Sequence, residues 1–381
     1  MSPLPTLAIA SVLGVAALGS AACSRSTASP PETRPVPATE APLTVPNDVA
    51  PVGAAPTAPT WEVHEWGLVD ANLASGQLRL AAGPALRPQR PMATRKPVLY
   101  IHLGPGLAAQ AFTARVTIPG GAIAEMWPEA ELAADGLVWK NVRATSGTCA
   151  SRGVQPLRDA PPACDSLDRM CELDELPRYV TDDAACLTTA HGDAPLLFYR
   201  GTATPRALPL GVTLTKDGTV DVRPVADMKA TPSTLIRIAM PCRGPVVPGE
   251  TMAVAVAKVP GPEGTTIPYP TQPADRAALR AQLAADLATQ GLTPSEAKAF
   301  LDAWMDELFG AGADPQRENQ RRLAPIRPMS DALIYWMPAA TIDTVATLTF
   351  EPRPTAVRRA MLVRVDLGAT CAATGGPAVP Q

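Results

Sequence analysis

Residues 98–127 read VLYIHLGPGLAAQAFTARVTIPGGAIAEMW. Within this stretch, three runs rich in apolar and β-branched residues are separated by glycine and proline clusters at residues 104–106 and 119–121. Short runs of this kind, bounded by turn residues, predict β-strands. Because only three residues separate the second run from the third, we expect those two runs to form a hairpin. The stretch therefore predicts a β-rich fold.

The same pattern continues along the chain. Further candidate strands lie at residues 196–199, 212–215, 220–222, 235–239, 252–259, 332–336, 345–350 and 361–366. Asp217-Gly218 lies between two of these runs and predicts a hairpin with a type I′ turn. The chain has 44 prolines in 381 residues, roughly twice the usual share, which fits short strands joined by rigid turns. No long alternation of strands and helices is present, which argues against a doubly wound parallel sheet.

Residues 274–310 are the helical exception. Leu279, Leu283 and Leu287 recur at intervals of four, and Gly291 provides a C-terminal stop. Thr293-Pro294-Ser295-Glu296 then predicts a capping box at the start of a second helix. On that helix one apolar face is expected, made by Ala297, Phe300, Leu301, Trp304 and Leu308.

These patterns together predict a mainly β protein of the α+β class. We expect an antiparallel β-sandwich-like body over residues 61–370, with an αα-hairpin inserted at about 274–310 and a short tail at 371–381.

The N-terminus predicts export. Residues 7–18 form an apolar stretch of 12 residues, shorter than the about 20 that a membrane span needs. Small residues and then Cys23 follow, so residues 1–22 resemble a bacterial lipoprotein signal, which implies lipidation of Cys23. Ser24 after that cysteine would imply sorting to the outer membrane. A simple cleaved signal and a retained anchor are the alternatives.

Residues 24–60 predict an extended linker. Nine of these 37 residues are proline, most of the others are alanine, threonine or serine, and none is aromatic. Such a composition favours a polyproline-II-like stalk between an anchor and a folded body.

The cysteines point to an oxidising compartment. Apart from Cys23, six remain, an even number suited to three disulfides. We expect pairing within the group Cys149, Cys164, Cys171 and Cys186, and a separate bridge between Cys242 and Cys371. The absence of C-x-x-C argues against a zinc ribbon or a thioredoxin-type motif.

A family resemblance covers roughly residues 61–368. Residues 61–67, WEVHEWG, resemble the His-Glu-Trp-Gly opening of a bacterial family of secreted and lipoprotein-type proteins. Segments at 96–100, 123–128, 197–201, 296–299 and 359–365 resemble that family in the same order. The family has no assigned activity, so the resemblance implies a secreted, β-rich protein and no catalytic residue.

Candidate chemistry is sparse. The three histidines are His64, His102 and His191. A metal site could draw on His64 and His102 with Glu65 or Glu125, but no H-E-x-x-H or H-x-H motif supports it. In a strand, His64 and Trp66 would point to one side and Glu65 to the other, so His64 and Glu65 would not share a ligand set. We therefore expect structural histidines and no metal or cofactor, and keep His64, Glu65, Trp66, His102 and Glu125 as functional candidates.

Two functions are compatible with the sequence. The first is a surface-tethered binding or structural lipoprotein whose partner is a protein, a glycan or an envelope component. The second is an envelope hydrolase or metalloenzyme that uses His64, Glu65 and His102. The formal net charge of −3 argues against a nucleic-acid partner. No nucleotide-binding motif and no nucleophile elbow is present.

Overall fold

The computed structural model describes residues 60–72, 92–149, 173–203, 208–225, 234–239, 252–258, 263–309 and 331–367. By internal contacts the chain divides into two compact units, residues 1–55 and 56–381, and every described residue belongs to the second. The expected signal segment, Cys23 and nearly all of the linker lie outside the described residues. None of the helices in the described part of the chain is both long and apolar enough to span a membrane.

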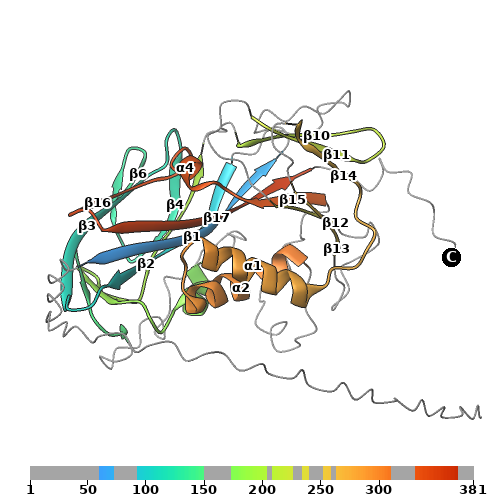
Figure 1. Ribbon diagram of the computed structural model, residues 1–381. Coiled ribbons are helices and arrows are strands. Elements are labelled where there is room, and N and C mark those ends of the chain that lie inside the picture. Colours follow the sequence, from blue (N-terminus) through green and yellow to red (C-terminus); the bar gives the residue numbers. More distant parts are fainter. Residues whose placement is uncertain are drawn as a thin grey trace, which may run out of the picture. The chain divides into compact units, whose positions relative to one another are not determined.

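The largest of three sheets contains eight strands (Figure 1). In chain order they are β1 Trp61–Asn72, β2 Met92–Leu103, β4 Ala122–Trp127, β9 Leu197–Ala203, β12 Leu235–Ala239, β13 Ala253–Ala257, β15 Asp331–Trp336 and β17 Ala356–Asp366. They lie side by side in the order β13-β12-β15-β17-β1-β2-β9-β4. β1 and β17 run parallel, whereas the other neighbours are antiparallel.

Two smaller sheets complete the β-structure. The second sheet contains β3 Ala109–Thr117, β5 Glu131–Ala133, β6 Gly136–Thr145, β7 Cys186–Thr189, β8 Gly192–Ala194 and β16 Thr347–Glu351. The third contains β10 Leu210–Leu214, β11 Val220–Pro224 and β14 Thr265–Ile267. The mainly β, sandwich-like fold class predicted from the sequence is confirmed.

The prediction that residues 112–127 form a hairpin is wrong. β3 pairs with β6 and β16 in the second sheet, while β4 pairs with β9 in the large sheet. A tight turn joins them: the Gly121 N–H donates to the Ile118 carbonyl at 2.8 Å, and Gly120 has a φ of 66°. The turn therefore carries the chain from one sheet to the other, because a strand pattern does not specify which sheet a strand joins.

The hairpin between β10 and β11 is confirmed, but its turn type is not. The Thr215 N–H donates to the Thr219 carbonyl at 2.9 Å, and the Gly218 N–H donates to the Thr215 carbonyl at 3.2 Å. Gly218 has a φ of 82°, whereas Asp217 is not among the residues with positive φ. The loop thus has three residues with glycine at its left-handed position, and a two-residue type I′ turn would need both residues there.

The large sheet separates two hydrophobic cores. Along β2, Leu99 and Ile101 pack into the core shared with the second and third sheets. Val98 and Tyr100, which alternate with them, pack into the core shared with the helices. Side chains alternate between the two faces of a strand, so each strand contributes to both cores.

The helical hairpin is confirmed on the second of these faces (Figure 1). It consists of α1 Arg276–Thr289 and α2 Pro294–Phe309, and Gly291 between them has a φ of 88°. The Arg276 guanidinium reaches the Asp306 carboxylate at 2.7 Å, so the start of α1 lies beside the end of α2 and the two helices are antiparallel. Trp304 is fully buried, as its position on the apolar face predicts.

The capping box is also confirmed. The Thr293 N–H donates to Glu296 Oε2 at 2.8 Å, and the Glu296 N–H donates to Thr293 Oγ1 at 3.2 Å. These two bonds satisfy backbone donors that the first turn of a helix leaves without intrahelical partners.

Replacing Thr293 by alanine should therefore lower the free energy of unfolding by about 1 kcal/mol. Chemical denaturation of the purified protein measures the change. Thr289→Ala is the matched control: this threonine lies exposed at the end of α1, where substitutions usually change stability by no more than about 0.5 kcal/mol. Equal losses in both variants would contradict a capping role for Thr293.

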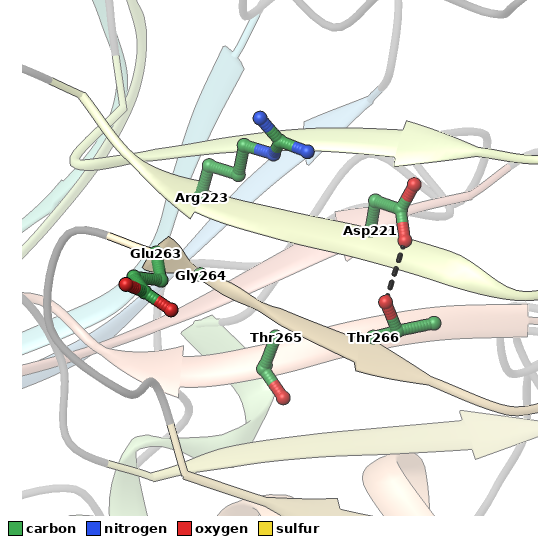
Figure 2. Close-up of a pocket in the computed structure, with 6 residues that line it drawn as sticks. All are labelled: Asp221, Arg223, Glu263, Gly264, Thr265 and Thr266. Atoms are coloured by element: carbon green, nitrogen blue, oxygen red, sulfur yellow. Dashed lines mark hydrogen bonds between the residues drawn. The ribbon is translucent and has the colours of Figure 1, made fainter.

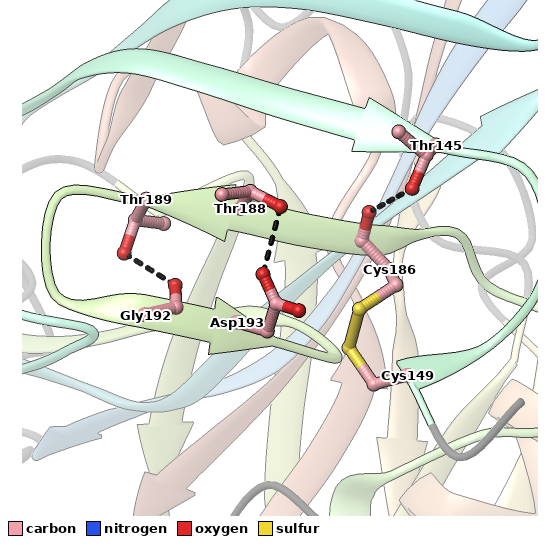
Figure 3. The surroundings of a disulfide bond; sticks show 7 residues. All are labelled: Thr145, Cys149, Cys186, Thr188, Thr189, Gly192 and Asp193. Carbon is pink, nitrogen blue, oxygen red and sulfur yellow. Dashed lines mark hydrogen bonds between the residues drawn. A yellow bond between two sulfur atoms is a disulfide. The ribbon is translucent and has the colours of Figure 1, made fainter. Parts of the chain in front are cut away.

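One disulfide joins Cys149, which follows β6, to Cys186, the first residue of β7 (Figure 3). Both cysteines are buried. This bond agrees with the expected pairing inside the group of four cysteines. Cys164, Cys171, Cys242 and Cys371 lie outside the described residues, so the remaining pairings stay predictions.

Candidate functional site

Two histidines meet on the helix-covered face of the large sheet. In the antiparallel pairing of β1 and β2, Glu62 lies opposite His102, and His64 lies opposite Tyr100. His64 and His102 are thus diagonal neighbours, pointing to the same side as Tyr100. Their ring centroids are 4.3 Å apart.

Glu296 joins this pair from the first turn of α2. Its Oε1 lies 2.7 Å from His102 Nε2, and its Oε2 lies 2.9 Å from His64 Nδ1. Because Glu296 is also the glutamate of the capping box, its carboxylate is held from three directions: by both imidazoles and by the Thr293 N–H. We call His64, His102 and Glu296 the histidine–glutamate cluster.

The cluster stabilises an ionised carboxylate in a buried position. Glu296 has no exposed surface. Burial alone would raise its pKa, but hydrogen bonds from His102 and His64, the charge of His64 and the Thr293 N–H outweigh burial and lower the pKa to about 2. The N-terminus of α2 favours a negative charge at the same place.

The pKa of His102 shifts in the direction opposite to that of Glu296. Burial alone would lower its pKa, but the hydrogen bond to Glu296 and the charge of Glu296 outweigh that effect. The nearby Asp183 and Glu62 act in the same direction, so the pKa of His102 is raised. The side chain of His102 keeps 19% of its surface exposed, against 7% for His64 and none for Glu296.

One nitrogen of the cluster has no hydrogen-bond partner. His64 Nε2 is buried and makes no hydrogen bond within the described residues. Glu62 Oε2 lies 3.5 Å from this nitrogen. Arg358 Nε approaches the same oxygen at 3.4 Å. Glu62 thus stands beside the cluster as a partly exposed neighbour.

Tyr100 lies beside the cluster on the large sheet, opposite His64. Its hydroxyl donates to the Tyr179 carbonyl at 2.5 Å. Burial, together with the negative charge of Glu296, raises the pKa of Tyr100 well above its usual value. The phenol therefore stays neutral beside the cluster.

The other candidate residues lie elsewhere. Glu65 points to the opposite face of β1, where it accepts hydrogen bonds from Tyr199 and Arg359. The expected alternation along β1 is thereby confirmed, and Glu65 cannot join His64 in a ligand set.

Glu125 is paired with Arg200 at 2.7 Å, on the strands β4 and β9, and it is not part of the cluster. Trp66 is fully buried and packs edge-on against Tyr179 and Phe300. Its role in the structure is that of a core residue.

A separate pocket lies on the third sheet and shares no residue with the cluster (Figure 2). It is lined by Asp221, Arg223, Glu263, Gly264, Thr265 and Thr266. Thr266 donates a hydrogen bond to Asp221 at 2.8 Å. None of these six lining residues is a histidine or a cysteine.

Sequence reasoning did not include Glu296 among the functional candidates. The capping-box pattern identified the residue but gave it a purely structural role. Its distance from His64, 232 positions along the chain, hides the contact. A polar side chain on the inward face of an amphipathic helix was the one signal available, because Glu296 precedes the buried Ala297 and Phe300 by one residue and four.

No model of a known protein family matches the chain, and no match is found among curated proteins.

Chemically, the cluster offers two imidazole nitrogens and a carboxylate whose ligand atoms all lie within 4.8 Å of one another. Such a set can share protons in a buried hydrogen-bond network, or it can surround a metal ion.

Proposed function

We propose that this protein is an exported, lipid-anchored protein of the bacterial cell envelope whose β-rich body serves as a binding or structural module. The observation that carries the proposal is Cys23, placed directly after a short apolar segment that ends in Gly-Ser-Ala-Ala. Residues 24–60 would then act as a stalk between the lipid and the body.

The buried Cys149–Cys186 disulfide supports export. Disulfides persist in the periplasm and outside the cell, and they are rare in a reducing cytoplasm. The resemblance of residues 61–67 to a family of secreted and lipoprotein-type proteins points the same way. Ser24 favours the outer membrane as the destination.

A protein, a glycan or another envelope component is the kind of partner that we propose for the body. The formal charge of −3 gives no basic field that would attract nucleic acid.

Replacing Cys23 by serine tests the anchor. Expressed in a Gram-negative host, the wild-type chain should appear in the membrane fraction as a processed, lipid-modified protein. The Cys23→Ser variant should either leave the membrane fraction or remain unprocessed, because the acyl chains have no thiol to join. Ser26→Ala, which changes a nearby small residue, should behave as the wild type does.

Membrane fractionation with mass spectrometry of the N-terminal peptide gives the result. A processed Cys23→Ser protein that stays with the membrane would rule out this anchor.

The histidine–glutamate cluster favours a second candidate function, a metal-dependent envelope enzyme. In that case Glu296, rather than Glu65 or Glu125, would stand with His64 and His102. A metal-dependent enzyme requires an ion at this position, whereas a binding or structural module does not, so a purified protein that holds and binds no metal would rule out this second candidate.

A further inference from the structure

We propose that His64, His102 and Glu296 form a binding site for one divalent transition-metal ion, and that the ion is zinc. The site lies between the large sheet and the first turn of α2. The inference rests on the geometry of the cluster and not on export or lipidation, so it stands or falls independently of the anchor.

The donor types suit this ion. Zinc in proteins is bound by imidazole nitrogen, thiolate sulfur and carboxylate oxygen, and two histidines with one glutamate are a known ligand combination. Calcium and magnesium prefer oxygen donors throughout, so two imidazoles argue against either of them.

The distances suit it as well. Bond lengths of about 2.0–2.2 Å place the donor atoms of a tetrahedral zinc site roughly 3–3.5 Å from one another. In the cluster, Glu296 Oε2 lies 2.9 Å from His64 Nδ1, and Glu296 Oε1 lies 2.7 Å from His102 Nε2. Glu296 Oε1 alone lies 2.7 Å from His102 Nε2 and 3.1 Å from His64 Nδ1, so a shift of a few tenths of an ångström brings these two pairs to zinc-binding separations. The ligand atoms of all three residues lie within 4.8 Å of one another.

The placement of the two His64 nitrogens also suits a metal ligand. Nδ1 faces Glu296 and the rest of the cluster. Nε2 is buried and makes no hydrogen bond within the described residues, although Glu62 Oε2 lies 3.5 Å away. When Nδ1 binds a metal ion, the imidazole carries its proton on Nε2, on the side of Glu62.

That arrangement, a carboxylate behind a metal-bound histidine, is the usual outer support of a zinc ligand. Glu62 would thus orient His64 without contacting the ion. Arg358, which approaches Glu62 from β17, would hold that carboxylate in turn.

The site would also be accessible. His102 is the most exposed member of the cluster, with 19% of its side-chain surface open to solvent. Three protein ligands leave the fourth position of a tetrahedral zinc ion free for water, as in catalytic rather than structural zinc sites.

The test is metal binding by the full-length protein, purified without metal-affinity resin or chelator. Elemental analysis measures the metal retained, and titration of the chelator-treated protein with Zn²⁺ measures affinity. We expect one equivalent of zinc per chain, and zinc should also raise the melting temperature, because a ligand bound only by the folded state stabilises it.

Four variants define the site. Glu296→Gln keeps the side-chain length and the capping box, which accepts glutamine, and His102→Gln removes the second imidazole. Each should weaken zinc binding by more than the roughly 10- to 100-fold that loss of an outer hydrogen-bond partner costs. Glu62→Gln should weaken it by about tenfold. His191→Gln removes the exposed histidine between β7 and β8 and should leave the zinc affinity unchanged.

A wild-type protein that neither retains nor binds zinc overturns the proposal. So does zinc binding that Glu296→Gln and His102→Gln leave unchanged. Binding of Co²⁺ to the wild type provides a check that does not depend on the variants folding: a d–d absorption spectrum of nitrogen and oxygen ligation, abolished by excess Zn²⁺, supports the site, and the absence of such a spectrum contradicts it.

Discussion

Replacing Arg237 by methionine is expected to lower the free energy of unfolding by about 3–5 kcal/mol, the usual cost of removing one partner of a buried ion pair. Arg237 and Asp331 lie on the paired strands β12 and β15 and have 0% and 1% of their side-chain surface exposed. The guanidinium donates to both oxygens of Asp331, at 3.0 and 2.6 Å. Without the guanidinium, the Asp331 carboxylate remains buried and loses this counterion.

Arg237 also ties the third sheet to the large one. Its Nη1 donates to the Gly218 carbonyl at 2.8 Å and to the Ile267 carbonyl at 3.1 Å. These two carbonyls belong to the β10–β11 turn and to β14. The substitution removes both bonds, which adds to the loss.

The loss should depend on pH. Burial holds the pKa of Asp331 above its usual value even though Arg237 lowers it, and the charge of Asp366 adds to the rise. Removing Arg237 raises this pKa further, so the folded variant gains a proton more readily than the unfolded chain does. The destabilisation should therefore be largest at about pH 7 and smaller at about pH 5, where the carboxyl is neutralised.

Urea denaturation at the two pH values measures this. The double variant Arg237→Met with Asp331→Leu should recover part of the loss, because no charge is then buried, while the two carbonyls still lack their donor. Arg223→Met is the control, because this arginine is exposed and lies on β11 of the third sheet, which Arg237 contacts from the large sheet. A pH-independent loss, or a double variant no more stable than the single one, would contradict this account.

Replacing Trp304 by alanine is the second large effect, with an expected loss of about 3–5 kcal/mol. Trp304 is fully buried between α2 and the large sheet, in the core that Phe300 and Leu308 share. Removing the indole leaves a cavity that surrounding side chains can fill only in part.

Two comparisons make this second measurement specific. Trp304→Phe should cost less, because most of the ring volume stays. Leu132→Ala removes a side chain that is 67% exposed and should fall within about 0.5 kcal/mol of the wild type. A loss at Trp304 no larger than that at Leu132 would mean that the helical hairpin contributes little to the core.

Local signals predicted the elements of the fold, and long-range pairing determined the rest. The strand at residues 235–239 and the two helices were predictable because periodicity, glycine stops and the Thr293 cap act over a few residues. The failure of the 112–127 hairpin has the opposite cause: β3 and β4 are joined by a short turn, but their hydrogen-bond partners come from distant strands. The parallel β1–β17 pair was equally invisible to local patterns.

The candidate site likewise combines features that local patterns predict with features that depend on long-range contacts. Strand alternation correctly separated His64 from Glu65, because that rule acts between adjacent residues. Glu296 could not be found in this way, since its contact with the histidines depends on how the helical hairpin docks on the sheet. Arg237 was hidden for a similar reason: its counterion and its carbonyl acceptors come from three other strands and turns.

The parallel pairing of β1 with β17 has a consequence for how the body is made. Residues 65 and 359, joined in the middle of the large sheet, are 294 positions apart. At about 5–20 residues per second, roughly 15–60 s of synthesis separate β1 from β17. Until β17 is present, β1 can pair with β2 only, and closing so long a loop makes the β1–β17 pairing slow. Chains in which β17 has not yet joined β1 are therefore expected to be exposed to proteases and chaperones.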